Sequence, residues 1–130
     1  MADKISFDLV SPEKLLLSEE ADMVTIPGTE GEMGVMAGHM PLITTLRPGV
    51  ISVSGGANER FVVLGGFAEV NQSKVTVLAE EAIPAADFTQ TVLDSRITQA
   101  AEDLNQAKTD AEKSARQSYL DNLQMLRLAV

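Results

Sequence analysis

The first part of the chain alternates between apolar and polar residues with the two-residue period of half-buried β-strands. In the segment KISFDLV, Ile5, Phe7 and Leu9 share one face, because successive side chains of a strand point to opposite sides. Two reversals, at residues 55–58 and 71–74, each lie between runs rich in β-branched residues. Strands separated by such turns predict an antiparallel sandwich or barrel.

After residue 84 the period becomes helical. Two apolar stripes recur at helical spacing: Leu93, Ile97, Ala101 and Leu104, and then Ala111, Ala115, Tyr119, Leu123 and Leu126. The capping pairs Asp87–Gln90 and Thr109–Glu112 predict where the two helices begin. We expect a chain of mainly β plus α class: an antiparallel β-sandwich over residues 1–84, and an antiparallel two-helix hairpin over residues 85–130 whose alanines allow close helix packing.

Composition narrows the partners that this fold could bind. The net charge of −9 disfavours nucleic acid, which needs clustered Lys and Arg. No apolar run approaches the roughly 20 residues of a spanning helix, so direct membrane insertion is not expected. The chain has no cysteine, which excludes disulfides, thiolate metal sites and cysteine nucleophiles. The N-terminus lacks the features of a signal peptide, so we expect a cytosol-facing protein.

The segment PGTEGEMGVMAGHMP, residues 27–41, concentrates unusual residues. It holds four of the nine glycines, three of the six methionines and the only histidine. We consider a phosphate-binding loop, a catalytic loop and a contact patch. A phosphate loop would need a lysine after its last glycine, whereas His39 follows Gly38. No helix is predicted to follow and present its N-terminus to a phosphate.

A catalytic loop would depend on His39 as a general base or metal ligand. No GxSxG nucleophile elbow and no carboxylate spacing for Ca²⁺ or Zn²⁺ accompanies it, so we predict no metal and no catalytic residue. A small hydrolase using His39 stays an alternative, as does an imidazole that bonds backbone groups. Met33, Met36 and Met40 favour a contact patch, because exposed thioethers conform to a partner surface.

The segment GTEGEMGVMAGHMPLITTLRPG resembles the glycine-rich segment of the epsilon subunits of F-type ATP synthases, whose pattern is GxEGExGvxpGHxPl…lxPG. GGFAEV followed by VTVLAEEA is similar to the family's later strand pair, and the resemblance covers essentially the whole chain. It implies a β-sandwich followed by a helical hairpin. It also implies a non-catalytic rotor subunit of the central stalk, without a cofactor, that couples the gamma subunit to the membrane ring of c subunits in proton-driven ATP synthesis. We therefore expect a peripheral protein on the cytoplasmic face of the bacterial inner membrane.

The resemblance also implies site residues. By motif position, Glu32 and His39 would meet the polar loops of the c-ring at one end of the sandwich. The expected c-ring interface also includes Glu30 for its charge, Met36 and Met40 for their soft side chains, and Gly31 of the motif, which shapes the loop. Loop-shaping roles are expected at Gly28, Gly34, Gly38 and Pro41.

In bacterial relatives the hairpin can extend along gamma to the alpha/beta catalytic head and inhibit hydrolysis, and in some it binds ATP through an [IL]-D-x-x-R-A pattern. Here the sequence is LDSRI, with Asp94 and Arg96 two residues apart. Positions i and i+2 of a helix point to different faces, so we expect weak or absent ATP binding. A nucleotide-sensing hairpin using Asp94, Arg96 and Arg116 stays an alternative, and the hairpin is expected to regulate or to brace.

Overall fold

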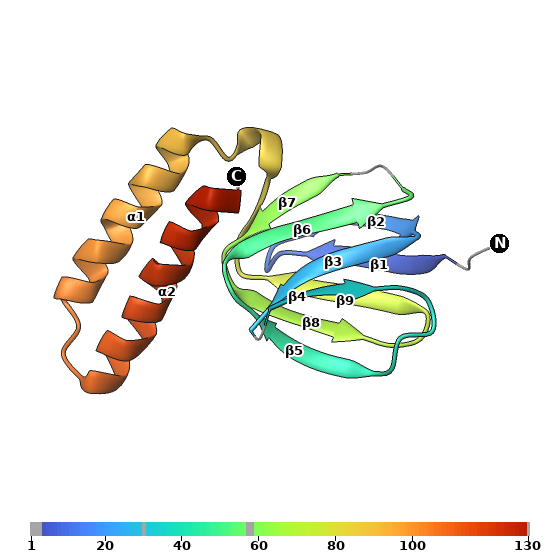
Figure 1. Ribbon diagram of the computed structural model, residues 1–130, viewed down its shortest axis with the longest axis horizontal. Helices are drawn as coiled ribbons and strands as arrows, with labels where there is room; N and C mark the ends of the chain where they lie inside the picture. Colours follow the sequence, from blue (N-terminus) through green and yellow to red (C-terminus); the bar gives the residue numbers. More distant parts are fainter. Residues whose placement is uncertain (1–3, 30, 57–58, 130) are drawn as a thin grey trace.

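The computed structural model describes residues 4–29, 31–56 and 59–129. Within these residues the chain forms a ten-stranded sheet followed by a short 3₁₀ helix and two α-helices (Figure 1). The strands are β1 (Ile5–Val10), β2 (Leu15–Ala21), β3 (Met23–Gly28), β4 (Gly31–Val35), β5 (Leu42–Leu46), β6 (Gly49–Ser54), β7 (Arg60–Val63), β8 (Gly66–Val70), β9 (Lys74–Ala79) and β10 (Ala82–Pro84), and the helices are η1 (Ala85–Asp87), α1 (Gln90–Asn105) and α2 (Asp110–Ala129). No helix in the described part of the chain is long and apolar enough to cross a membrane.

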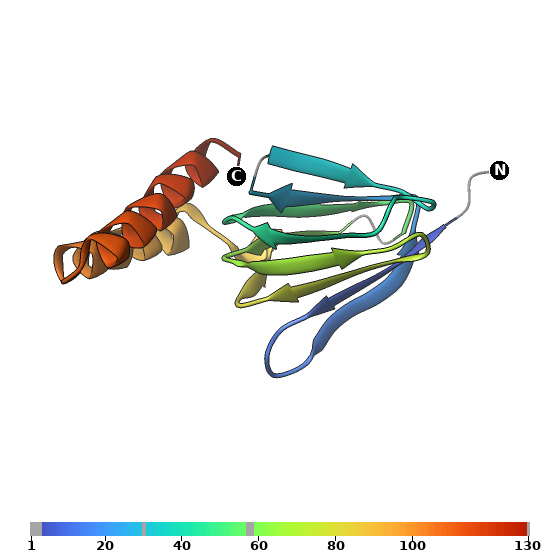
Figure 2. The same ribbon diagram turned by 90° about the horizontal axis from the view of Figure 1, so that it is seen from below.

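The sheet folds over on itself into a sandwich (Figure 2). Its strand order is β10-β7-β6-β3-β5-β8-β9-β1-β2, with β4 added beside β3. The fold-over lies between β3 and β5, which pair only through Gly28 and Leu46. The predicted antiparallel sandwich is confirmed with one correction, because β1 and β9 run parallel. These strands are far apart in the sequence, and a long connection allows either direction where a tight hairpin does not.

Two apolar clusters hold the parts together. Ile5, Phe7 and Leu9 of β1 are fully buried between the layers of the sandwich, as the alternation predicts. The second cluster joins the helical hairpin to the outside of the sheet, where Val62 points away from the sandwich interior. Among the described residues, the buried members of this cluster are Val62, Leu64, Phe88, Leu93, Ala100, Leu120, Leu123 and Leu126.

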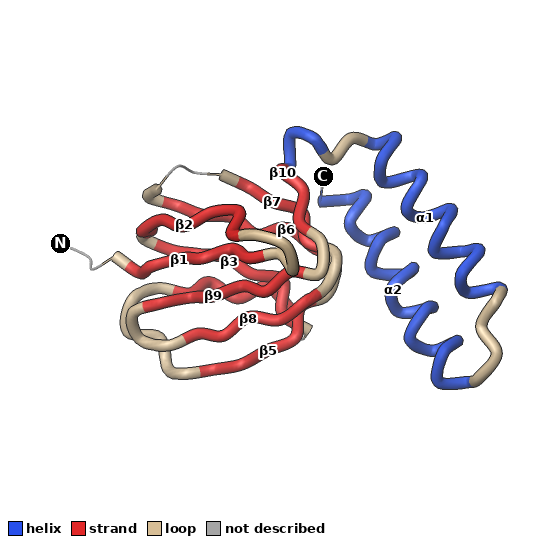
Figure 3. The backbone as a smooth tube through the Cα atoms, turned by 180° about the vertical axis from the view of Figure 1, so that it is seen from behind, coloured by secondary structure: helices blue, strands red, loops and turns tan. Residues whose placement is uncertain are grey.

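The hairpin lies at one end of the sandwich. Helix α2 runs back toward the sandwich, so that the C-terminal end of α2 lies beside it (Figure 3). Helix α1 begins after Thr89, whose hydroxyl accepts a hydrogen bond from the Val92 backbone N–H at 3.3 Å. The predicted Asp87–Gln90 capping pair is therefore wrong, because Asp87 belongs to the preceding 3₁₀ turn. No acidic residue or Gln stands three residues after Thr89, so the capping-box pattern does not identify this residue.

The start of α2 agrees with prediction. The Glu112 N–H donates to the Thr109 hydroxyl at 3.1 Å, and the Glu112 carboxylate accepts from the Lys108 N–H at 3.1 Å. The expected contact through Ala111 and Ala115 is wrong, because both are exposed. Apolar packing in the hairpin instead concentrates near the sandwich, around the second cluster.

Candidate partner-binding surfaces

Residues 27–41 do not form the single loop that their glycines suggested. Strands β3 and β4 make a tight hairpin in which Gly28 lies opposite Gly31 and Pro27 opposite Glu32. In β4, Val35 is fully buried and Met33 packs partly against the core, whereas Glu32 is exposed. The alternation in this segment therefore specifies a strand, and residues 36–41 connect it to β5.

Glu32 lies near the start of β4, whereas His39 lies in the connection that follows its end. The start of β4 lies at the end of the sandwich nearest α2, and the connection from β4 to β5 lies at the far end (Figure 1). A strand of this length spans roughly 16 Å. The expectation that Glu32 and His39 lie together at one end is therefore wrong, whereas their individual roles stay predictions. Glu30 lies outside the described residues.

The far end carries a surface that we name the distal loop, residues 36–41. Met36 is 54% and Met40 78% exposed. The Nδ1 of His39 lies 2.7 Å from the Met40 carbonyl oxygen, and since that oxygen can only accept, Nδ1 carries the proton. The Gly38 N–H donates to the Gln72 carbonyl at 2.7 Å and ties the loop to the β8–β9 turn. The imidazole thus bonds backbone, as one sequence interpretation proposed.

The glycines of this segment have two different roles. Gly31 and Gly38 have φ values of +138° and +89°, which other residues rarely adopt. Gly28 and Gly34 instead leave room for neighbours, since an added Cβ would lie 3.0 Å from the Gly31 carbonyl oxygen and 3.1 Å from the Met23 sulfur, respectively. Pro41 is exposed and leads into β5.

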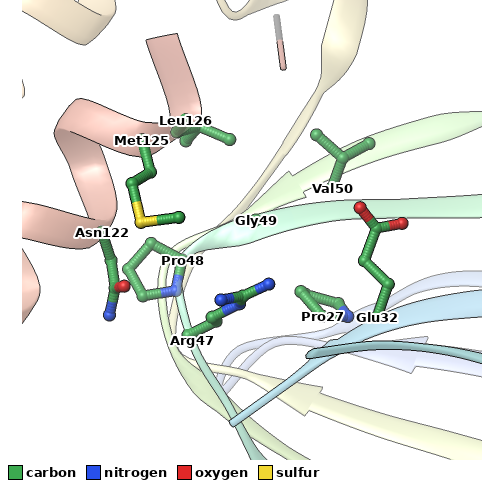
Figure 4. Close-up of a pocket in the computed structure, with 9 residues that line it drawn as sticks. All are labelled: Pro27, Glu32, Arg47, Pro48, Gly49, Val50, Asn122, Met125 and Leu126. Carbon is green, nitrogen blue, oxygen red and sulfur yellow. The ribbon is translucent and has the colours of Figure 1, made fainter. Parts of the chain in front are cut away.

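The end near α2 contains a groove of about 150 Å³ between the sandwich and the hairpin, which we name the interdomain groove (Figure 4). It is lined by Pro27, Glu32, Arg47, Pro48, Gly49 and Val50 of the sandwich and by Asn122, Met125 and Leu126 of α2. Within the described residues, neither Glu32 nor Arg47 takes part in an ion pair. Met125 is 57% exposed. Both charges are therefore available to a partner.

A third surface crosses the outer face of the sheet, and we name it the outer row. Strand register places Leu15 opposite Val10, Val10 opposite Leu78, Leu78 opposite Phe67 and Phe67 opposite Thr45. Leu15, Phe67 and Leu78 are 56%, 43% and 38% exposed. Ile43, two residues from Thr45 on the same face, is 71% exposed. Sequence analysis missed this row, because only the pairing of distant strands aligns single outward apolar residues.

The residues proposed for nucleotide binding are engaged elsewhere. Arg96 donates to the Glu81 carboxylate through both Nη groups. Arg116 donates to the Asp103 carbonyl oxygen at 2.5 Å, near the end of α1. Asp94 is exposed and accepts from the Gln90 amide at 3.0 Å. The structure therefore does not gather Asp94, Arg96 and Arg116 into one site.

Two titratable groups have shifted pKa values, and both have structural causes. Hydrogen bonds from Lys74 and then Ser18 lower the pKa of Asp8 on the sheet surface, at 2.8 and 2.7 Å. Burial of the Tyr119 side chain on α2 raises the pKa of its phenol above the usual value. In the described residues no polar or charged side chain is buried, and no cluster of three His, Asp or Glu residues could hold a metal ion.

The fold and its surfaces define a binding protein made of a β-sandwich and a helical hairpin. Residues 4–85 match the sequence model of the family described as ATP synthase, Delta/Epsilon chain, beta-sandwich domain. The chain is 51% identical to the ATP synthase epsilon chain of Parvibaculum lavamentivorans over 100% of both chains. It is 46% identical to that of Mesorhizobium japonicum over 100% of this chain and 98% of the relative. The chain therefore belongs to the ATP synthase Delta/Epsilon family.

Solved structures agree with this assignment. One chain of the Euglena gracilis mitochondrial ATP synthase, solved as the OSCP/F1/c-ring assembly, matches with a TM-score of 0.75 and 28% identity, over 97% of this chain and 81% of that one. A chain of the Tetrahymena thermophila mitochondrial ATP synthase central stalk and c-ring matches with a TM-score of 0.69 at 15% identity, over 98% and 97%. The second likeness concerns the fold alone.

Proposed function

We propose that the chain is the non-catalytic rotor subunit of the central stalk that couples a gamma subunit to a c-ring in proton-driven ATP synthesis. The support is the full-length similarity to epsilon chains and the similarity to a chain of a structure that contains F1 and a c-ring. The protein would act as a peripheral component on the cytoplasmic face of the bacterial inner membrane. Its role is to join two partners, and the reaction takes place in other subunits.

The outer row is the observation that carries this proposal. Its apolar side chains continue across the outer face in register, which gives one continuous apolar surface over several strands. Apolar side chains at the centre of a contact supply most of its affinity. We assign this face to gamma, because a partner that transmits torque needs a broad, permanent contact.

The distal loop is assigned to the same partner. It leads directly into β5, whose Ile43 lies on the outer face, so Met36 and Met40 extend the apolar surface. His39, held by its bond to the Met40 carbonyl, would contribute a polar contact at its margin. This assignment replaces the c-ring role expected of these three residues from the sequence.

The interdomain groove is assigned to the c-ring. Its lining mixes a carboxylate, a guanidinium and an amide, which suits polar loops better than a broad apolar surface. Such charges set orientation and association rate. Glu32 therefore keeps the ring contact that its motif position implied.

Two single variants test the assignment of the outer row to gamma and of the interdomain groove to the c-ring. Phe67→Glu should abolish capture of purified gamma, whereas Glu32→Lys should leave gamma binding intact and reduce retention of the c-ring by the gamma complex. Thr91→Glu and Glu102→Lys on the exposed side of α1 are the matched controls. Gamma capture by the Phe67 variant equal to that of the unmodified protein would contradict the proposal.

The hairpin has a separate test. Deleting all residues after Ala86 removes both helices, and the assembled enzyme is then assayed for ATP hydrolysis and proton-coupled synthesis. A bracing hairpin predicts reduced synthesis without faster hydrolysis. An inhibitory contact with the alpha/beta head predicts faster hydrolysis. The near balance of positive and negative charges on α2 favours the brace.

A further inference from the structure

The interdomain groove is formed by two parts of the fold that belong to different structural units. One wall is the sandwich, where Glu32 is the second residue of β4 and Arg47 and Pro48 form the turn between β5 and β6. The other wall is the last part of α2, with Asn122 and Met125 (Figure 4). A partner side chain that enters this groove therefore contacts the sandwich and the hairpin at the same time.

The sandwich wall is rigid. The Arg47 N–H donates to the Pro27 carbonyl oxygen at 3.1 Å. Gly49 packs so closely on Pro27 that a Cβ added there would lie 2.5 Å from the Pro27 Cβ. Because these contacts fix the floor of the groove, its width depends on where α2 lies.

The size of the groove decides what kind of ligand can enter. Small-molecule sites usually occupy roughly 300–1,000 Å³, and this groove has about 150 Å³. It is too small for a nucleotide and large enough for one long side chain. We therefore look for a side chain that a partner protein inserts.

The lining specifies the chemistry of that side chain. Pro27, Pro48 and Met125 provide apolar contact for an aliphatic stem, and the Glu32 carboxylate provides a partner for a cationic head. Lys and Arg combine these two properties. Arg47 offers donors to carbonyl oxygens of the loop that carries the inserted residue, and its charge directs the cationic head toward Glu32. The net charge of −9 adds long-range attraction for a basic loop.

We infer that α2 forms one wall of the c-ring site, and that a basic side chain of a ring loop inserts between Glu32 and Met125. This inference rests on the proposed function, because it takes Glu32 as the ring contact. Coupling between two sites is reciprocal. Ring binding therefore stabilises the docked hairpin, and a displaced hairpin weakens the hold of the subunit on the ring.

The test uses the full chain bound to gamma and measures its affinity for c-rings in lipid nanodiscs. Met125→Lys places a cation where the inserted head group would lie and supplies Glu32 with an internal partner. Gln124→Lys adds the same charge to the neighbouring exposed position, which does not line the groove. We expect about tenfold weaker binding for Met125→Lys, less than twofold change for Gln124→Lys, and near-normal binding for Met125→Leu.

Glu32→Gln separates this inference from the proposed function. If both residues hold the same side chain, the losses caused by Met125→Lys and Glu32→Gln should be less than additive in the double variant, because contacts that share a partner are not additive. Weak binding by Glu32→Gln with equal affinities of Met125→Lys and Gln124→Lys would overturn the α2 wall and leave Glu32 as the ring contact. Normal binding by both Glu32→Gln and Met125→Lys would overturn both proposals.

Hydrogen exchange on the unmodified protein gives a readout that needs no variant. Ring binding should slow amide exchange in residues 119–126 of α2, where the helix lies against the sandwich. Unchanged exchange in this segment on ring binding would contradict the reciprocal coupling.

Discussion

Arg96 of α1 donates from both Nη groups to the Glu81 carboxylate in the short segment between β9 and β10. Among the described residues, this is the ion pair that joins the hairpin to the sandwich. The second apolar cluster also joins the two parts, and apolar burial has little directionality. The bidentate pair therefore adds a directional contact to the docking of the hairpin.

Removing this pair should destabilise the docked hairpin modestly. Both side chains are 38% exposed, so we expect a loss of about 1 kcal/mol for Arg96→Ala or Glu81→Gln in urea unfolding. Arg60→Ala, an exposed arginine on β7, is the control and should change stability by less than about 0.5 kcal/mol. A double-mutant cycle in which the Arg96 and Glu81 effects add fully would show that the pair contributes no coupling energy.

The corner between β7 and β8 should tolerate no side chain. Gly66 has a φ of +129°, and a Cβ there would lie 2.2 Å from the Leu78 carbonyl oxygen. Gly66→Ala therefore adds a backbone clash to the conformational strain, and we expect a loss of more than about 3 kcal/mol. Gly38→Ala is the matched control, because Gly38 has a φ of +89° with nothing within 4 Å of the added Cβ.

The control should lose only about 1–2 kcal/mol. Thermal unfolding of both variants gives the comparison. Equal losses at the two positions would mean that strain alone, and not the contact with Leu78, decides the cost at Gly66.

Asp8 should make stability depend on acid pH. Its pKa lies below the usual 3.8 because Lys74 and Ser18 donate hydrogen bonds to the carboxylate. A carboxylate whose pKa is lowered in the folded state stabilises the protein at pH values above its unfolded-state pKa. This stabilisation is lost as the pH falls through the folded-state pKa. Asp8→Asn should therefore cost about 1–2 kcal/mol near pH 7, and the difference from the unmodified protein should shrink below about pH 4.

Urea unfolding at several pH values between about 3 and 7 measures this difference. Asp87→Asn replaces an exposed carboxylate on η1 and should give a small difference that does not vary in the same way. A pH-independent cost of Asp8→Asn would contradict a contribution from the charged form.

The sequence predicts local structure well where one signal dominates. The alternation around Phe7 and the capping box at Thr109 are both confirmed, because each depends on neighbours in the chain. The parallel pairing of β1 with β9 depends on contacts between distant segments, which no local pattern records. The glycines around Glu32 suggested a loop, whereas the buried Val35 and the pairing with β3 make it a strand.

The same distinction applies to the candidate surfaces. Glu32 and His39 stand in one motif, and a short strand separates them in space. The outer row and the interdomain groove depend on strand register and on the position of α2, so neither Phe67 nor Met125 stands out in the sequence. A motif thus identifies residues that belong to a function and leaves open which of them share a surface.

ATP should not bind the folded hairpin with useful affinity. The Arg96 guanidinium is held by Glu81, and Arg116 donates to the Asp103 carbonyl and lies 3.7 Å from the Glu112 carboxylate. A nucleotide would have to break these contacts before either guanidinium could reach a phosphate.

A ligand with a dissociation constant of about 1 mM, present at about 5 mM, would stabilise the folded state by about 1 kcal/mol. For a chain of this size that corresponds to roughly 4 °C in Tm. We expect a shift below about 1 °C in a thermal melt with ATP, compared with a salt control of equal ionic strength. A larger shift that disappears in Arg116→Ala would instead identify the hairpin as a nucleotide site.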